Sequence, residues 1–352
     1  MGTSIATQPK TRVPEQSFAG DLPLCYTLRS GHVETLQRGT LVAARASGEV
    51  VLSVGDPEQR TFIRSSAKPF QAMALVLTGT VEALDLDEQD IAIACSSHSG
   101  EPAHVAAVSR LLSKAGLTVD DLQCGSHPPL SRPAADALER EGSRPTPLHN
   151  NCSGKHAGML AVCVHQGWPL ETYLEPGHPL QQLNLQTVSR VTSTPKSAID
   201  IGVDGCGVPV FYVPVRALAV AFARLATGEC LDNDLAAAAA QIRAAMLAYP
   251  LLVAGTGRFD TDLMVAACGG VVCKGGAQGA EGVGLIDSGI GIGLKITDGS
   301  SAAIPVTIFN TLRLLEVDQG LIERLQGYRS IPVTNHAGTL VGSIESTLNE
   351  DL

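Results

Sequence analysis

Ser65 and Lys68 stand three residues apart and are well suited to nucleophilic chemistry. If a helix begins near Ser65, both side chains lie on one face, because residues three apart are neighbours on a helix. A partly desolvated lysine near other cations can lose its proton and then remove the proton of a serine hydroxyl. The pattern is short, however, and a helix-capping serine beside a solvated lysine would also produce it.

Two further polar positions stand where predicted elements end. Ser97 follows the apolar run 91–95, which we predict to be a short buried strand, and Lys274 follows the strand-like run 271–273. The two glycines after Lys274 would let a substrate approach the backbone closely. A serine-rich helix cap around Ser97 and a solvated lysine at 274 are the alternative interpretations.

A third group of side chains could bind a metal ion. Cys152, Lys155 and His156 lie in one segment, and Asp204 and Cys206 lie in the glycine-bracketed turn 202–209. Cysteine, histidine and aspartate side chains on such turns can ligate zinc. The Cys-x-x-Cys pairs of structural zinc sites are missing from the sequence, so buried inert thiols are an open alternative. A cysteine nucleophile with a histidine base is another, whereas a disulfide is disfavoured in the cytoplasm.

The apolar pattern predicts the elements that position these residues. Runs with strand character bounded by turns alternate with longer alanine- and leucine-rich runs of helical character. We expect residues 1–19 to be disordered and residues 20–352 to form a single domain, since we find no repeat and no linker. The predicted strands are 41–44, 50–54, 91–95, 271–273, 285–287, 291–296 and 338–344, and the predicted helices begin at Ser65 or cover 102–115, 134–141, 157–163, 218–227, 235–248 and 303–315.

Composition excludes several functional classes. The chain has 352 residues, a net charge of −10 and scattered basic residues, which disfavours nucleic acid and anionic membranes as partners. Its most apolar stretch, 210–226, is interrupted by charged residues, so we expect no membrane span and no signal peptide. The nine cysteines lack the spacing of a disulfide scaffold, which favours reduced thiols and a cytoplasmic location. Neither a phosphate loop nor a dinucleotide-binding motif occurs.

Five segments together resemble the asparaginase II family of the Rhizobium etli type: 64–71, 95–104, 149–159, 202–209 and 254–261. The resemblance covers residues 20–345. It implies an α+β fold, an α/β sandwich in which an antiparallel sheet is flanked by helices, similar to serine β-lactamases and glutaminases. The third motif reads Lys-Gly-Gly at 274–276 where β-lactamases have Lys-Thr-Gly, and residues 97–99 lack the β-lactamase asparagine, which disfavours β-lactam chemistry.

The resemblance also implies roles for individual residues. It implies two serine–lysine pairs, Ser65 with Lys68 and Ser97 with Lys274. It further implies zinc (Zn²⁺) bound by three side chains and water, in which the lysine has to be neutral because an ammonium group has no lone pair. The implied zinc ligands are Cys152, Lys155 and Cys206, and the implied substrate-binding residues are Asp204 for the α-ammonium group, Arg64 for the α-carboxylate and His156 as polar support beside the metal.

We therefore expect an L-asparagine amidohydrolase that releases L-aspartate and ammonia through a lysine-activated serine. The family implies a homodimer with a small-molecule substrate. Glutaminase activity, β-lactam-type serine acyl transfer and zinc binding without catalysis are the alternatives.

Overall fold

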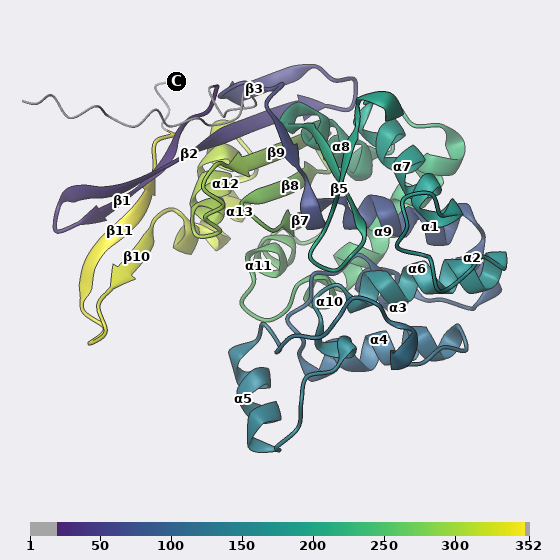
Figure 1. The fold of residues 1–352 in the computed structure, drawn as a ribbon. Coiled ribbons are helices and arrows are strands. Elements are labelled where there is room, and N and C mark those ends of the chain that lie inside the picture. Colours follow the sequence, from purple (N-terminus) through teal and green to yellow (C-terminus); the bar gives the residue numbers. More distant parts are fainter. Residues whose placement is uncertain (1–19, 349–352) are drawn as a thin grey trace, which may run out of the picture.

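Eight antiparallel strands form the main sheet, in the order β10-β11-β1-β2-β9-β8-β7, with β3 paired to β2 (Figure 1). This computed structural model describes residues 20–348, so the predicted disordered segment 1–19 and residues 349–352 lie outside the described residues. The main sheet contains β1 (Leu22–Arg29), β2 (His32–Arg45), β3 (Val50–Val54), β7 (Val271–Gly276), β8 (Ala280–Leu285), β9 (Ile290–Ile296), β10 (Ile331–Thr334) and β11 (Leu340–Ser346), and a second sheet contains β4 (Arg60–Phe62), β6 (Pro209–Pro214) and β5 (Asp200–Val203).

Helices surround the β7 end of the main sheet, whereas β1, β2, β10 and β11 extend away from them as an arm (Figure 1). All strand pairs in both sheets are antiparallel. The predicted α+β architecture, an antiparallel sheet flanked by helices, is therefore confirmed. The helices are α1 (Lys68–Leu77), α2 (Thr80–Ala83), α3 (Glu88–Ala94), α4 (Pro102–Lys114), α5 (Arg132–Arg140), α6 (Ser153–Gln166), α7 (Pro179–Thr192), α8 (Val215–Thr227), α9 (Asn233–Ala248), α10 (Pro250–Val253), α11 (Phe259–Ala266), α12 (Ala303–Leu314) and α13 (Gln319–Arg324).

Glycines in β8 and β9 let helix α8 pack directly on the sheet. A Cβ atom at Gly291 would lie 1.9 Å from the carbonyl oxygen of Ala219, and one at Gly293 would lie 2.5 Å from that of Val215. These positions have no room for any side chain, so the helix backbone contacts the strand backbone. The close packing fixes β8 and β9, and with them the neighbouring strand β7 that carries Lys274.

The predicted strand 91–95 is wrong, because these residues lie mostly in helix α3. Asp87 caps this helix: its carboxylate accepts hydrogen bonds from the backbone of Gln89 and Asp90, and Asp90 bonds back to the backbone of Asp87. A short apolar run has the same pattern in a buried strand and in a buried helix, so the capping box decides the outcome. Ser97 therefore follows a helix rather than a strand.

Most other predicted elements are confirmed within a few residues, including the long helices α4, α8, α9 and α12 and the strands β3, β7 and β9. The predicted strand 285–287 is wrong, because β8 ends at Leu285 and a turn follows, and the predicted strand 41–44 is only the end of the longer β2. The predicted helix at Ser65 begins three residues later, since Ser65 lies in a 3₁₀ turn (Arg64–Ala67) that leads into α1. Within residues 20–348, no helix has both the length and the apolar character needed to cross a bilayer. The division into a single domain from residue 20 stays a prediction.

Candidate active site

Ser65 lies on a strained turn directly before helix α1. The preceding residue, Arg64, has φ of 48°, in the left-handed region that non-glycine residues rarely adopt. Such backbone strain concentrates at functional sites and persists only where the surroundings impose it. The Ser65 hydroxyl forms no hydrogen bond with any residue in the described part of the chain, and it lines the pocket described below. Ser65 is thus presented with its hydroxyl free.

Lys68 connects the turn at Ser65 with the segment after helix α3. Its Nζ atom donates to the carbonyl oxygens of Ser96 at 2.5 Å and Asn151 at 3.2 Å, and it lies 2.9 Å from the Ser97 hydroxyl oxygen. A neutral amine with two N–H groups on the two carbonyls would direct its lone pair at Ser97. The hydrogen bond therefore pairs Lys68 with Ser97, and none joins Lys68 to Ser65 among residues 20–348.

Burial lowers the pKa of Lys68 to about 8. The Cys152 thiolate opposes this change, and the positive charges of Lys155 and Lys274 add to it. The side chain is 1% exposed, so its charge has little solvation. Lys68 consequently loses its proton more readily than an exposed lysine.

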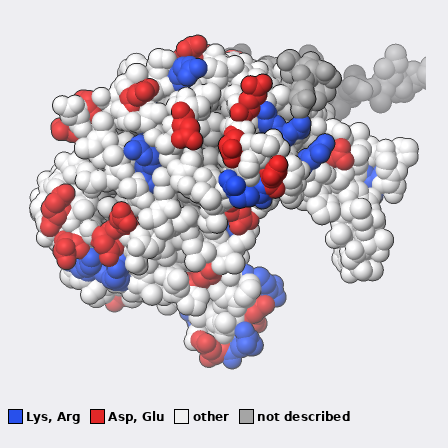
Figure 2. Space-filling model, turned by 180° about the vertical axis from the view of Figure 1, so that it is seen from behind, with Lys and Arg blue, Asp and Glu red and all other residues white. Residues whose placement is uncertain are grey.

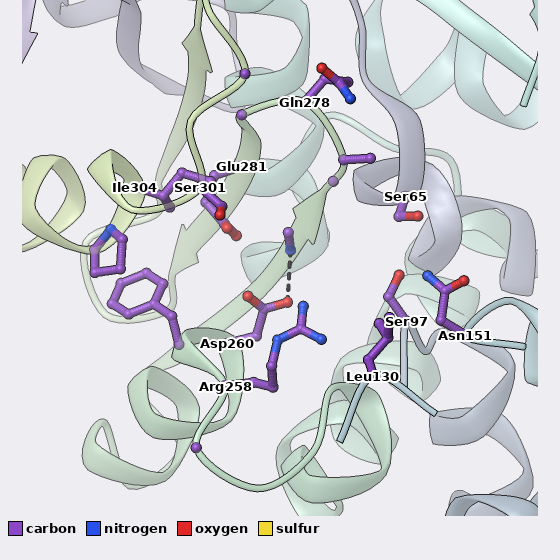
Figure 3. Close-up of a pocket in the computed structure, with 18 residues that line it drawn as sticks. Ser65, Ser97, Leu130, Asn151, Arg258, Asp260, Gln278, Glu281, Ser301 and Ile304 are labelled. Atoms are coloured by element: carbon purple, nitrogen blue, oxygen red, sulfur yellow. Dashed lines mark hydrogen bonds between the residues drawn. The ribbon is translucent and has the colours of Figure 1, made fainter. Parts of the chain in front are cut away.

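Both serines line one pocket of about 490 Å³. In Figure 3, Ser65, Ser97 and Asn151 lie on one side of it, and Asp260 and Glu281 lie on the other. Asp260 and its neighbour Arg258 come from the start of α11, and Glu281 comes from β8. The pocket thus lies between the helical part of the molecule and the sheet.

Lys274 lies beneath the acidic side of this pocket and is fully buried. Its Nζ atom is 3.4 Å from the Asp260 carboxylate and donates to the carbonyl oxygen of Gly275 at 2.6 Å. Asp260 also accepts a hydrogen bond from the Gly275 backbone at 2.8 Å, drawn as the dashed line in Figure 3. In residues 20–348 the observed partner of Lys274 is therefore Asp260, and no hydrogen bond joins Lys274 to Ser97.

The two pocket carboxyl groups have opposite pKa shifts. Burial raises the pKa of Glu281 well above its ordinary value, and the nearby negative charge of Asp260 adds to this. Burial also disfavours ionised Asp260, but Lys274 and the backbone of Gly275 outweigh it and lower the pKa of Asp260. At neutral pH, Asp260 is therefore ionised and Glu281 holds its proton.

The predicted zinc ligands converge in the buried space behind Lys68. Cys152 and Lys155 stand three residues apart at the start of α6, and Cys206 lies in the turn between β5 and β6. Lys155 Nζ is 3.1 Å from Cys206 Sγ, and a hydrogen bond from Cys206 lowers the pKa of the Cys152 thiol well below its usual range. All three side chains are at most 5% exposed.

Two sulfur atoms and one nitrogen at these positions fit three corners of a tetrahedral zinc site. Residues 20–348 contain no group of three histidine, cysteine, aspartate or glutamate side chains that could hold a metal ion. The fit therefore depends on the lysine. Without metal, the Cys152 thiolate and the contact with Cys206 outweigh burial and raise the pKa of Lys155, so metal binding would have to displace its proton.

The three predicted substrate-binding residues lie on the metal side, and each already has a partner. Arg64 holds Oδ1 of Asp204 at 2.5 Å, and the Gly205 backbone donates to the same oxygen. His156 is fully buried, with Nδ1 at 2.6 Å from the Tyr173 hydroxyl. Burial lowers the pKa of His156, so it is neutral, and its Nε2 atom has no partner in the described residues.

Sequence reasoning did not single out Asn151, Arg258, Asp260 or Glu281. The first three lie inside segments that carry the family resemblance, but the resemblance assigned no function to them. Glu281 has no such signal. It reaches the site because it stands opposite Gly275 in the pairing of β7 with β8, which only the register of the sheet reveals.

The family model for L-asparaginase II matches residues 25–346. The chain belongs to this family. This membership agrees with the resemblance carried by the five motifs. No curated protein matches the chain.

Similar solved structures include two crystal structures of Mglu, one with 4.3 M NaCl and one in its native form. The structure with 4.3 M NaCl is 16% identical, and the match covers 76% of this chain and 59% of that chain. The native form is 15% identical, and the match covers 83% of this chain and 63% of that chain. Each has a TM-score of 0.34. The chain thus spans less than two thirds of the length of these Mglu chains. A β-lactamase from Mycobacterium bovis is 14% identical, with 75% of this chain and 89% of that chain covered and a TM-score of 0.40.

Proposed function

We propose that this enzyme hydrolyses L-asparagine to L-aspartate and ammonia, with Ser65 as the nucleophile. The observation that carries the proposal is the position of a buried lysine, Lys68, beside two serines that line one pocket in a chain of the L-asparaginase II family. An unbonded serine hydroxyl and a buried lysine of lowered pKa are the two parts that such catalysis requires.

In the proposed reaction, the Ser65 oxygen attacks the side-chain amide carbon of asparagine. The Ser65 proton passes to Ser97, and the Ser97 proton passes to neutral Lys68, which lies within hydrogen-bonding distance of Ser97. Protonated Lys68 then returns a proton to the departing nitrogen, so ammonia leaves and an aspartyl ester of Ser65 forms. Water cleaves the ester by the same proton path in reverse. Lys274, held by Asp260, contributes positive charge near this path.

The substrate-binding part of the proposal uses the atoms that the Arg64–Asp204 ion pair leaves free. Arg64 contacts only Oδ1 of Asp204, so Oδ2 can accept the α-ammonium group of asparagine. The N–H groups of Arg64 that do not contact Asp204 can face the α-carboxylate. His156 supports this side through its hydrogen bond with Tyr173.

Zinc would be held by Cys152, Lys155 and Cys206, and it would supply a fixed positive charge on the substrate side of the site. The support is the meeting of these three buried side chains. Elemental analysis should find about one zinc per wild-type chain and much less in Cys206→Ser. Equal zinc contents in the two proteins would remove the metal from the proposal.

We also propose a homodimer in the cytoplasm. Exposed apolar side chains on the arm, at Val33 (63% exposed), Leu36 (49%) and Leu340 (67%), support an interface there. Sedimentation of the full chain as a monomer at micromolar concentration would contradict the dimer.

Ammonia release from L-asparagine and L-glutamine tests the proposed activity. The substrates differ by one methylene group, which a pocket discriminates by about 1–3 kcal/mol, or roughly 10- to 200-fold in kcat/KM. We expect the larger kcat/KM for asparagine. Turnover of glutamine alone would make the enzyme a glutaminase, and release from neither amide would refute the proposal.

A further inference from the structure

The wall of the pocket opposite the serines carries an arginine that the proposed reaction does not use. Arg258 precedes helix α11 and lines the same pocket as Ser65 and Ser97. In Figure 3 its guanidinium group extends from the side of Asp260 toward that of Ser97. It is thus available to a molecule bound in the pocket.

The Arg258 guanidinium group forms no hydrogen bond and no ion pair with any residue in 20–348, and only the backbone of Arg258 is hydrogen-bonded, to Gly255 and Asp262. This contrasts with Arg64, whose guanidinium group makes two hydrogen bonds to Asp204. A half-buried guanidinium group has lost part of its hydration, and a partner that neutralises it recovers that loss. The pocket therefore has an unused site for an anion.

Neighbouring groups restrict the kind of anion that fits. Asp260 is ionised and close enough for the charge of Arg258 to lower its pKa, while Glu281 holds its proton and has one buried oxygen atom without a partner. A fixed negative charge beside Arg258 disfavours a multiply charged anion such as phosphate. The planar guanidinium group matches the two oxygen atoms of a carboxylate.

We propose that Arg258 binds a carboxylate group of the substrate on the side of the pocket opposite Ser65 and Ser97. This inference rests on the proposed function. Two sources of the carboxylate are compatible with this chemistry. One is the α-carboxylate of asparagine, in which case Arg258 takes the role given above to Arg64. The other is a carboxylate carried by the substituent on the amide nitrogen of a substituted amide, which we call the amine side. A pocket of about 490 Å³ has room for such a substituent, whereas release of ammonia alone would not require that room.

Isothermal titration calorimetry on the full chain separates these sources with two matched pairs of probes. L-Aspartate and β-alanine differ only in the α-carboxylate. N-β-Aspartylglycine and N-β-aspartylglycinamide differ in whether the terminal group on the amine side is a carboxylate or a neutral amide. Each probe is titrated into the wild type, Arg258→Gln and Arg258→Lys. Arg132→Gln is the matched control, because Arg132 is 85% exposed on helix α5.

We expect Arg258→Gln to weaken the carboxylate-bearing member of one pair by about 10- to 100-fold, and the other member by less than about threefold. Arg258→Lys should retain part of the affinity, which separates lost charge from misfolding. A difference within the first pair, with both members of the second pair weakened equally, identifies the α-carboxylate. A difference within the second pair alone identifies the amine side. Equal effects within both pairs, no effect in either, or no binding of any probe by the wild type would overturn the proposal. Calorimetry requires no turnover, so ammonia release tests the proposed function separately.

Discussion

At the scale of single residues, the site depends on which charges its buried groups carry. Lys68, Lys155 and Lys274 are each at most 4% exposed, and each lies within 3.4 Å of a thiol, hydroxyl, carbonyl or carboxylate group. Because water has little access to these side chains, neighbouring protein groups supply their hydrogen bonds. The pairing of Lys68 with Ser97 and of Lys274 with Asp260 is the direct consequence.

Glu281→Gln tests the charge assignment in the pocket. The pKa of Glu281 is raised well above its ordinary value of 4.5, so its stabilising contribution is complete below pH 4.5 and is lost as the pH rises through the folded-state pKa. Glutamine has no such titration. The free energy of unfolding of Glu281→Gln should therefore increase relative to that of the wild type as the pH rises above 4.5. Urea denaturation between pH 4 and pH 9 measures this difference.

Asp262→Asn serves as the comparison, since Asp262 lies on the same helix, α11, as the pocket residue Asp260 and does not line the pocket. A constant difference between Glu281→Gln and the wild type across this pH range would show that Glu281 is ionised in the folded protein.

At the scale of elements, the site exists because one helix packs unusually close to the sheet. The glycines of β8 and β9 bring α8 onto the strands, and Gly276 at the end of β7 leaves room for the turn that carries Ser65: a Cβ atom there would lie 2.8 Å from the Ile63 carbonyl oxygen. The relative positions of Ser65 and Lys274 thus depend in part on close contacts between backbone atoms.

Gly291→Ala should destabilise the fold by about 1–3 kcal/mol, because its methyl group would overlap the backbone of α8. Thermal unfolding measures the change. Gly177→Ala is the matched control, because Gly177 is exposed and a Cβ atom there would meet nothing within 4 Å. Equal melting temperatures for the two variants would mean that α8 does not approach β9 as closely as described.

The elements also show what the sequence could predict. Periodicity located most of the long helices but not α7, and it located the strands β2, β3, β7, β9 and β11, in which apolar residues predominate. It failed for residues 91–95, where a helix of two turns and a buried strand share one pattern, and where the cap at Asp87 decides. The five motifs located the two serines, Lys68 and the predicted metal ligands, whereas Lys274 lies outside them. The hydrogen-bond partner of each lysine depends on long-range packing, which no local pattern encodes.

At the scale of the whole molecule, residues from distant parts of the chain meet between the helices and the sheet. Arg258, Asp260 and Glu281 reach the pocket from α11 and β8, and only the fold places them opposite Ser65. On the face shown in Figure 2, acidic and basic side chains of the described residues alternate without a large area of one sign. With a net charge of −10, the chain offers little electrostatic attraction for a polyanion.

The most direct test of the central claim is the rate of ammonia release from L-asparagine by Ser65→Ala. If Ser65 carries the acyl group, kcat should fall by about a thousandfold or more, while the melting temperature stays near that of the wild type. Ser113→Ala, a change at an exposed position on α4, should behave as the wild type does. Release by Ser65→Ala within about tenfold of the wild type would contradict the account, and a loss confined to Ser97→Ala would move the nucleophile to the serine that Lys68 contacts.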